Sequence, residues 1–391
     1  MTARRVLIGQ IACFGDILYA TTIARQIKHD TPDAHITWAV AAKYRSILDH
    51  NPDIDSIWEL PIHTRDITKH DWIPFEKEAE ARRIRGEFTE ILYTQIIDTH
   101  IEKFLTTLRQ TVFRIFGQPI TVDVRGVVRL TDEERARVRT FVDTHALTNY
   151  RHVVLFECTP SSLQSKLSID FALSIAQELT ARHPDVAFVL SSHQKIPTGL
   201  KRVFSAQELS YRENAELTKY CTMLIGCSSG ITWLATSGWA RRLPMLQLLD
   251  ERSQIFCGIT FDHELNGLDT STIIEMTRYD LGQATACAEQ MLAGDVAGAR
   301  TRFHQVYRPN RWTLTSTAIA LWHKERRSLG GMWKFINEYI RENARLGNDI
   351  KVNRLAVLAS IVLEMLRNSP HPIMRTGRRA VRRLREFWMN R

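Results

Sequence analysis

The sequence predicts an α/β protein with two doubly wound parallel sheets, followed by a helical C-terminal extension. Two observations carry this prediction. In the first half of the chain, short apolar runs alternate with segments whose apolar residues recur at helical spacing, as in a parallel sheet covered on both faces. The same alternation starts again near residue 153 and continues to about residue 249. Two successive units of this kind leave a cleft between them, with the ends of strands from both units facing it.

In the first unit, each apolar run has the length of a strand that is buried on both faces. The expected strands are residues 6–12, 35–41, 56–61 and 90–97, and the expected helices are residues 17–28, 43–49 and 101–116. Residues 61–86 are highly charged and contain Trp72, Pro74 and Phe75. This stretch favours a surface loop with short helical pieces.

The second unit begins after a helix whose start is marked by a capping box. Thr131 can cap this helix, and Glu134 can reach back from three residues later. Beyond a crossing at residues 148–151, the expected strands are residues 153–156, 186–191, 223–226 and 243–249, and the expected helices are residues 169–182, 214–220 and 232–239. This order predicts an N-terminal domain at residues 1–149, a second domain at 150–300 and an extension at 301–391.

The C-terminal part has helical spacing and ends in an arginine-rich segment. Helices are expected at residues 281–292, 302–307, 332–345 and 352–367. Seven arginines then follow from Arg375 to Arg391, together with Phe387 and Trp388. Two interpretations stay open: a solvated helix packed on the first domain, or an interfacial helix on anionic lipid. Nucleic acid is not an expected partner, because no basic platform with interleaved aromatic residues accompanies the arginines.

The composition of the whole chain favours anionic partners and a reducing compartment. The 391 residues carry a formal net charge of +9 at pH 7, which favours nucleotides, phosphorylated glycolipid or an acidic membrane. The six cysteines include no Cys-x-x-Cys pair, so a disulfide scaffold is not indicated. No stretch has the uninterrupted apolar length of a membrane span or a signal peptide. We therefore expect a cytoplasmic protein, with peripheral contact at the inner membrane left open.

The turn after the first expected strand places a carboxylate at the start of a helix. Gly15 is expected to take a backbone conformation that other residues resist, and Asp16 then lies in the first helical turn. Ligands bind at this edge of an open α/β sheet. Asp16 can be a group that favours the positive end of the helix, or a general base aimed into the cleft. The local pattern alone favours the first alternative.

Three ordered motifs near the N-terminus resemble the heptosyltransferase-like glycosyltransferases, the lipopolysaccharide heptosyltransferase family. The motifs are Phe14-Gly15-Asp16-Ile17-Leu18, Thr31-Pro32-Asp33-Ala34 and Asn51-Pro52-Asp53-Ile54. The resemblance implies the GT-B architecture, in which two Rossmann-like domains face a cleft. It also implies inverting sugar transfer and gives Asp16 the role of catalytic base.

A hydroxyl-rich loop follows the first strand of the second unit. Hydroxyl groups, loop amides and an ammonium are what a pyrophosphate needs, although Ser168 also fits the N-cap of the next helix. The loop resembles the diphosphate-binding loop of the same family, which implies that Thr159, Ser161 and Lys166 bind the diphosphate. Ser168 stands where the family has a tryptophan.

A second small-residue turn, Gly226-Cys227-Ser228-Ser229-Gly230, ends a strand and begins a helix, so its amides would face a ligand. It resembles the family's Gly-x-Asp-[Ser/Thr]-Gly-x-x-His signature at Ser229 and Gly230. Ser228 replaces the aspartate of that signature and Trp233 replaces the histidine, a version similar to the branch with protein O-heptosyltransferases. By this resemblance, Gly15 and the three residues 228–230 belong to the donor-binding site.

Taken together, the resemblance implies a glycosyltransferase that moves a heptose or related sugar. The donor is a nucleoside-diphosphate sugar, and the acceptor is a hydroxyl group of a glycan, glycolipid or protein. No cofactor or metal is expected, since Asp53-Ile54-Asp55, which has the spacing of a metal motif, follows Asn-Pro and fits a turn. A noncatalytic scaffold that binds nucleotide sugars stays open as an alternative. The residues at 228 and 233 favour the scaffold, whereas Asp16 and Lys166 oppose it.

Overall fold

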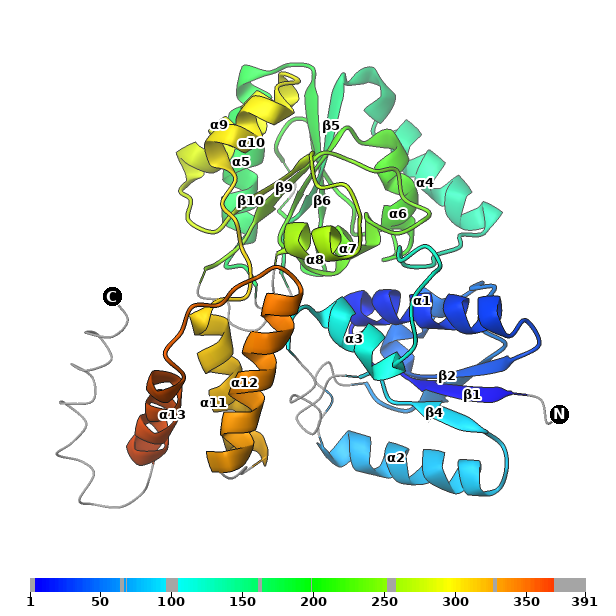
Figure 1. Cartoon of the computed structure of the whole chain (residues 1–391). Helices are drawn as coiled ribbons and strands as arrows, with labels where there is room; N and C mark the ends of the chain where they lie inside the picture. The colour runs from blue at the N-terminus through cyan, green and yellow to red at the C-terminus, as the bar shows by residue number, and fades with distance from the viewer. Residues whose placement is uncertain are drawn as a thin grey trace. The chain divides into compact units, whose positions relative to one another are not determined.

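The computed structural model describes residues 4–63, 67, 69–95, 105–160, 164–197, 199–251, 258–325 and 329–368. The chain divides into two compact units, whose elements are labelled in Figure 1. One unit contains both parallel sheets and is built from residues 1–95, 108–253 and 258–307. The other is built from residues 96–107, 254–257 and 308–391. The domain boundaries that the sequence suggested at residues 149 and 300 stay predictions.

The first sheet has four parallel strands in the order β3-β2-β1-β4. The strands are β1 (Arg5–Gly9), β2 (His35–Ala41), β3 (Ser56–Leu60) and β4 (Glu90–Leu92). From β1 the chain moves outward through β2 and β3, and it then returns to the other side of β1 as β4. The direction therefore reverses between β1 and β4. In open α/β sheets, ligands bind outside the carboxyl ends of the strands at such a switch point.

The second sheet has six parallel strands in the order β10-β9-β8-β5-β6-β7. The strands are β5 (His152–Glu157), β6 (Val186–Ser191), β7 (Val203–Ser205), β8 (Met223–Gly226), β9 (Met245–Leu248) and β10 (Ile273–Met276). Its switch point lies between β5 and β8, where Phe156 pairs with Ile225. The two loops that carry the expected donor motifs follow these two strands, so both loops lie at the carboxyl ends of neighbouring strands.

Helices connect the strands of this unit. They are α1 (Phe14–Asp30), α2 (Lys69–Ile84), α3 (Leu108–Phe116), α4 (Asp132–Thr144), α5 (Ile169–Arg182), α6 (Glu213–Leu217), α7 (Gly230–Leu234), α8 (Ile259–Leu265), α9 (Leu281–Leu292) and α10 (Val296–Phe303). The described residues of this unit also contain the short 3₁₀ helices η1 (Ala42–Leu48), η3 (Leu147–Asn149) and η4 (Thr218–Tyr220). The capping box at Thr131 and the N-cap at Ser168 are confirmed, since each side chain accepts a backbone N–H of its helix.

Strand β5 shows how the hydrophobic core is divided. Its side chains alternate between faces, as they must in a strand. Val153 and Leu155 belong to a large cluster that also contains residues of β1 and α1, whereas Val154 and Phe156 belong to a second cluster with α5 and α9. The first cluster is thus shared by the two sheets, because it includes Ile17 from α1 and Trp233 from α7.

Several expectations about helices are corrected by the structure. The stretch expected as a surface loop contains the continuous helix α2, with Pro74 inside it. Trp72, Phe75 and Ala79 are all buried, so this helix presents an apolar face at i, i+3 and i+7 despite its many charges. The helix expected at 43–49 is the 3₁₀ helix η1, and the one expected at 302–307 ends at Phe303 as α10.

The helical unit contains α11 (Arg311–Glu325), α12 (Leu329–Arg345) and α13 (Arg354–Asn368). Its own core includes Leu314, Met332, Phe335 and Tyr339. Asn343 ties this unit together, because its side-chain amide donates to the carbonyl of Leu105 at 2.7 Å. The arginine-rich segment at 375–391 lies outside the described residues.

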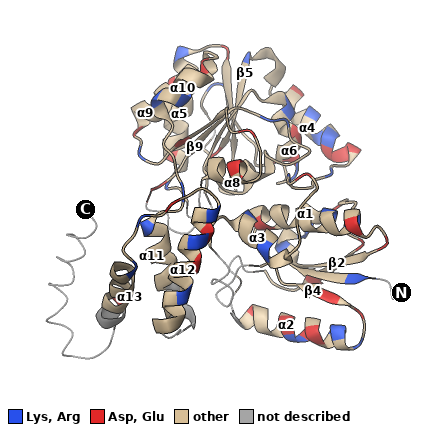
Figure 2. Ribbon diagram, viewed as in Figure 1, with Lys and Arg blue, Asp and Glu red and all other residues tan. Residues whose placement is uncertain are grey.

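Figure 2 shows acidic and basic residues interspersed along α2, whereas in α4 the acidic residues of the first turn precede the arginines. None of the helices in the described part of the chain is long and apolar enough to cross a membrane.

Candidate active site

Asp16 is the third residue of α1, at the carboxyl end of β1 and hence at the switch point of the first sheet. Its side chain is half-buried. Among the described residues, the Asp16 carboxylate has no hydrogen-bond or ion-pair partner. Burial raises the pKa of this carboxyl from 3.8 to about 7. A carboxylate with a pKa near neutrality and free oxygens has the properties of a general base.

A buried network of side chains holds the turn that leads into α1. The Gln95 side-chain oxygen accepts the Ala12 N–H at 2.8 Å and the Gln10 side-chain amide at 2.9 Å. Thr94 donates its hydroxyl to the Gln10 side-chain oxygen at 3.0 Å. Because Thr94 and Gln95 follow β4, the network ties together the two strand ends at the switch point. The position of Asp16 is therefore set by buried contacts rather than by a free loop.

The backbone conformation of this turn differs from the expectation. Cys13 has the left-handed φ of 70°, whereas Gly15 lies within α1 and is not left-handed. Gly15 is needed for another reason: a Cβ atom there would lie 3.3 Å from Cδ1 of Trp233. The glycine allows the indole ring of Trp233 to lie against the first turn of α1, next to Asp16 in the chain.

Aromatic side chains connect this turn with the second sheet. Trp233 and Tyr19 meet edge to face, with ring centroids 4.8 Å apart. Phe14 stacks on Tyr211 at 4.1 Å between centroids, and the Tyr211 hydroxyl donates to the Gly230 carbonyl at 2.6 Å. The structure thus brings the Gly15-Asp16 turn and the turn at residues 228–230 together through aromatic contacts.

A buried ion pair lies behind these rings. Arg109 of α3 and Asp262 of α8 are 2% and 3% exposed, and the Arg109 Nε and Asp262 Oδ2 atoms are 3.1 Å apart. The Arg109 guanidinium carbon lies 5.0 Å from the centre of the Tyr19 ring and 5.8 Å from that of Trp233. This pair joins a helix that follows the first sheet to a helix of the second.

The loop after β5 carries Thr159 and Lys166. The Thr159 hydroxyl donates to Ser192 at 3.1 Å, which attaches it to the loop after β6. Lys166 is 70% exposed, and its ammonium pairs with Asp250 at 2.7 Å. Both side chains lie at the carboxyl edge of the second sheet. Ser161, the third predicted residue of this loop, lies outside the described residues.

The turn after β8 is occupied by side chains of the protein itself. The buried Glu157 carboxylate accepts the Ile231 N–H at 2.7 Å, the Thr232 hydroxyl at 2.7 Å and the Cys227 N–H at 3.3 Å. The Ser228 N–H donates to the side-chain oxygen of Gln247 at 2.9 Å. These amides are therefore already bonded.

The assignment of residues 228–230 to the donor site stays a prediction. Ser228 is fully buried and has a left-handed φ of 50°, and Ser229 is 4% exposed. The side-chain amide of Gln164 donates to the Ser228 carbonyl at 3.2 Å, and the Gln164 carbonyl accepts the Asp250 N–H at 2.8 Å. The loop of Lys166 is thereby joined to the turn at 228–230, although no direct contact joins Asp16 with Lys166 in the described residues.

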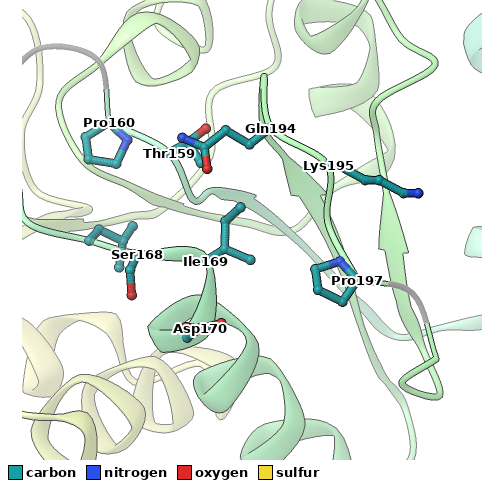
Figure 3. Close-up of a pocket in the computed structure, with 9 residues that line it drawn as sticks. Thr159, Pro160, Ser168, Ile169, Asp170, Gln194, Lys195 and Pro197 are labelled. Atoms are coloured by element: carbon teal, nitrogen blue, oxygen red, sulfur yellow. The ribbon is translucent and has the colours of Figure 1, made fainter.

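A pocket of about 490 Å³ opens beside Thr159. Its walls include Pro160, Ile169 and Pro197, and Gln194 and Asp170 bring polar groups to it. Figure 3 shows Thr159 close to Gln194, with the start of α5 on the facing wall. The pocket has the volume of a small-molecule site and a mixed apolar and polar lining. Within the described residues, no cluster of three or more His, Cys, Asp or Glu side chains could hold a metal ion.

Sequence reasoning missed Glu157, which accepts N–H groups of the turn after β8, and Asp250, which pairs with Lys166. A charged residue at the end of an apolar strand was the only signal for each of them, at residues 152–157 and 245–250. That signal says that the carboxylate needs a partner, but it does not say which partner.

Comparison with known proteins shows the fold. No protein-family model and no curated protein matches this chain. A glycosyl transferase family 9 structure from Veillonella parvula is similar at 13% identity and a TM-score of 0.50, over 76% of this chain and 98% of that one. The architecture is therefore the one expected, two parallel α/β sheets as in GT-B proteins.

Two structures from E. coli are more distant in shape. The ADP-heptose lipopolysaccharide heptosyltransferase II has 14% identity and a TM-score of 0.45, over 64% of this chain and 86% of that one. The heptosyltransferase WaaC with ADP has 13% identity and a TM-score of 0.46, over 76% of this chain and all of that one.

Proposed function

We propose that this protein is an inverting glycosyltransferase that uses a nucleoside-diphosphate sugar. The sugar is a heptose or a related sugar, and the acceptor is a hydroxyl group of a glycolipid, polysaccharide or protein. The observation that carries the proposal is Asp16: a carboxylate without a hydrogen-bond or ion-pair partner among the described residues, at a switch point, with a pKa raised to about 7. The motif resemblance at residues 14–18 gives the same residue the role of base.

The proposed reaction is a single displacement. Asp16 takes the proton from the acceptor hydroxyl while that oxygen forms a bond to the anomeric carbon. The bond between the anomeric carbon and the diphosphate breaks at the same time, and its electron pair leaves with the diphosphate. Lys166 supplies positive charge for that leaving group, and Thr159 supplies a hydroxyl donor. The nucleoside of the donor is proposed to bind in the pocket beside Thr159.

Substitution of Asp16 by asparagine tests the proposal. Asp16→Asn keeps the size of the side chain and removes the base, so transfer should fall by a factor of about 10²–10⁴ while donor binding and folding persist. Transfer from a panel of nucleotide sugars measures the rate, calorimetry with the same donors measures binding, and circular dichroism checks the fold. An Asp16→Asn protein that retains wild-type transfer excludes the assignment of Asp16.

The second candidate function is a noncatalytic scaffold that binds nucleotide sugars. The observation in its favour is that Glu157 and Gln247 already accept the N–H groups of Cys227, Ser228 and Ile231 at the turn after β8. Under this alternative, nucleoside diphosphates bind with measurable affinity but no donor of the panel is consumed. Calorimetry with a panel of nucleoside diphosphates, followed by transfer and hydrolysis assays of the donors that bind, separates the two candidates.

A further inference from the structure

The indole ring of Trp233 lies against the first turn of α1 at Gly15, the residue before Asp16. Trp233 lies in α7, which follows strand β8 of the second sheet. Asp16 lies in α1, which follows strand β1 of the first sheet. The contact is close, because an added Cβ at Gly15 would lie 3.3 Å from Cδ1 and 3.7 Å from Cγ of the indole. The other side of the ring meets Tyr19, one helical turn after Asp16, and Trp233 is only 8% exposed.

We propose that Trp233 is a positioning residue that shields the Asp16 carboxylate from water and so sets its strength as a base. The proposal deepens the proposed function, since it rests on Asp16 as the base. It also gives the contact between α7 and α1 a role, because Trp233 of α7 controls the protonation of Asp16 of α1.

The surroundings of Asp16 support shielding rather than charge as the mechanism. Burial in the protein raises the pKa of Asp16. Behind Tyr19 lie Arg109 and Asp262, which form one ion pair of opposite sign. The hydroxyl of Tyr211 faces the same region from the loop before α6, and its pKa is raised far above the working range by burial. None of these groups forms a hydrogen bond or ion pair with the carboxylate.

Shielding has a defined direction. Desolvation disfavours the charged form of a carboxyl group, so removal of the indole should lower the pKa of Asp16 toward its ordinary value. The base would then be ionised at lower pH but weaker, and a weaker base accelerates proton removal less. We therefore expect a downward shift of the acid limb of kcat/KM together with a lower kcat, and little change in the KM for the donor.

The test measures the titration of Asp16 directly, in the full-length protein. Aspartate labelled with ¹³C at the side-chain carboxyl is incorporated, and the Asp16 signal is assigned by its absence in Asp16→Asn. In Trp233→Ala, the midpoint of the Asp16 titration should fall by at least about one pH unit. Trp233→Phe retains part of the cover, so its midpoint should lie between those of Trp233→Ala and the wild type, and it serves as the test if the alanine variant does not fold.

Trp239→Phe is the matched control. Trp239 follows α7 in the chain, and its indole N–H donates to Glu216 of α6 at 2.7 Å. This variant should leave the Asp16 midpoint where it is in the wild type. If Trp233→Ala folds and its Asp16 titration midpoint equals that of the wild type, the proposal is overturned. If Trp233→Ala does not fold, a wild-type midpoint in Trp233→Phe overturns it. The titration needs no substrate. If the wild-type protein has no transfer activity, the proposed function is refuted, but the effect of Trp233 on the pKa of Asp16 can still be measured.

Discussion

Asp16 and Glu275 are two carboxyl groups that the fold favours in their protonated form. Burial raises the pKa of each to about 7. Such a group stabilises the folded state fully below its unfolded pKa of about 4, and this contribution is lost as the pH rises through 7. Asp16→Asn removes one of the two groups. The melting temperature of this variant minus that of the wild type should therefore be larger at pH 8 than at pH 5.

Thermal unfolding at the two pH values measures this difference. Asp33→Asn, in an exposed turn, is the control and should change the melting temperature by the same amount at both. An equal effect of Asp16→Asn at pH 5 and pH 8 would show that the carboxyl is protonated no more readily in the folded than in the unfolded chain.

Lys166 gives a second prediction at this scale. Its ammonium pairs with Asp250 and is exposed, so a diphosphate can compete for it. Lys166→Ala should weaken binding of a nucleoside diphosphate by about tenfold and leave binding of the uncharged nucleoside almost unchanged. Calorimetry with both ligands measures the two affinities.

Asp250→Asn is the counterpart of that variant. It releases Lys166 from its ion pair, so it should strengthen diphosphate binding. Lys201→Ala, on an exposed loop, should change neither affinity. If Lys166→Ala weakens the nucleoside and the nucleoside diphosphate equally, Lys166 does not contact the phosphates.

At the scale of elements, Glu157 joins the end of β5 to the start of α7. Its carboxylate accepts backbone N–H groups of Cys227 and Ile231 and the hydroxyl of Thr232. Glu157→Gln keeps one acceptor oxygen and places an NH₂ group against buried donors. We expect the free energy of unfolding to fall by about 2 kcal/mol, measured by urea denaturation.

Glu208→Gln is the matched control, since Glu208 is exposed. It should leave the unfolding free energy within about 0.5 kcal/mol of the wild type. A stable Glu157→Gln protein that binds nucleoside diphosphate more weakly would instead assign the turn at 228–230 to the donor site, as the motif resemblance implies.

The edge strands β7 and β10 of the second sheet were not expected, because each is short and contains a polar residue, Ser205 or Glu275. The other eight strands that the structure describes could be predicted because each is an apolar run bounded by turns. Helix α2 could not, because its apolar face consists of three residues among many charges. Trp72, Phe75 and Ala79 show their helical spacing only once the sheet that buries them is known.

The candidate site was predictable only in part, for a similar reason. Asp16 and Lys166 follow strands and carry charge, which is a local signal. The roles of Trp233 and Glu157 depend on which segments far apart in the sequence come together. Gly15 illustrates the difference. A glycine was expected there because of a left-handed backbone, but the residue with a left-handed φ is Cys13. Gly15 is needed because the indole ring of Trp233 leaves little room for a side chain.

At the scale of the whole molecule, positive charge is concentrated at one end of the sequence. Residues 369–391 contain seven arginines and one glutamate, against a net charge of +9 for the chain. Each basic side chain near an anionic membrane contributes about 1 kcal/mol, so this segment suits salt-sensitive membrane binding. Truncation after Ser369 should abolish sedimentation with anionic vesicles at low salt and leave turnover of a soluble acceptor intact.

The same pair of proteins tests the alternative of a helix docked on the first domain. That alternative predicts no sedimentation of the full-length protein and a lower melting temperature after truncation. Vesicles of neutral lipid are the control, and they should sediment neither protein.

The buried pair of Arg109 and Asp262 also constrains how the protein can be made. About 150 residues separate the two partners in the sequence, so a ribosome that adds about 5–20 residues per second produces the aspartate some 8–30 seconds after the arginine. Throughout that interval the guanidinium has no carboxylate to neutralise it and must remain in water, because an unpaired buried charge is strongly unfavourable. We therefore expect helix α3 to take its final place only after α8 has been synthesised.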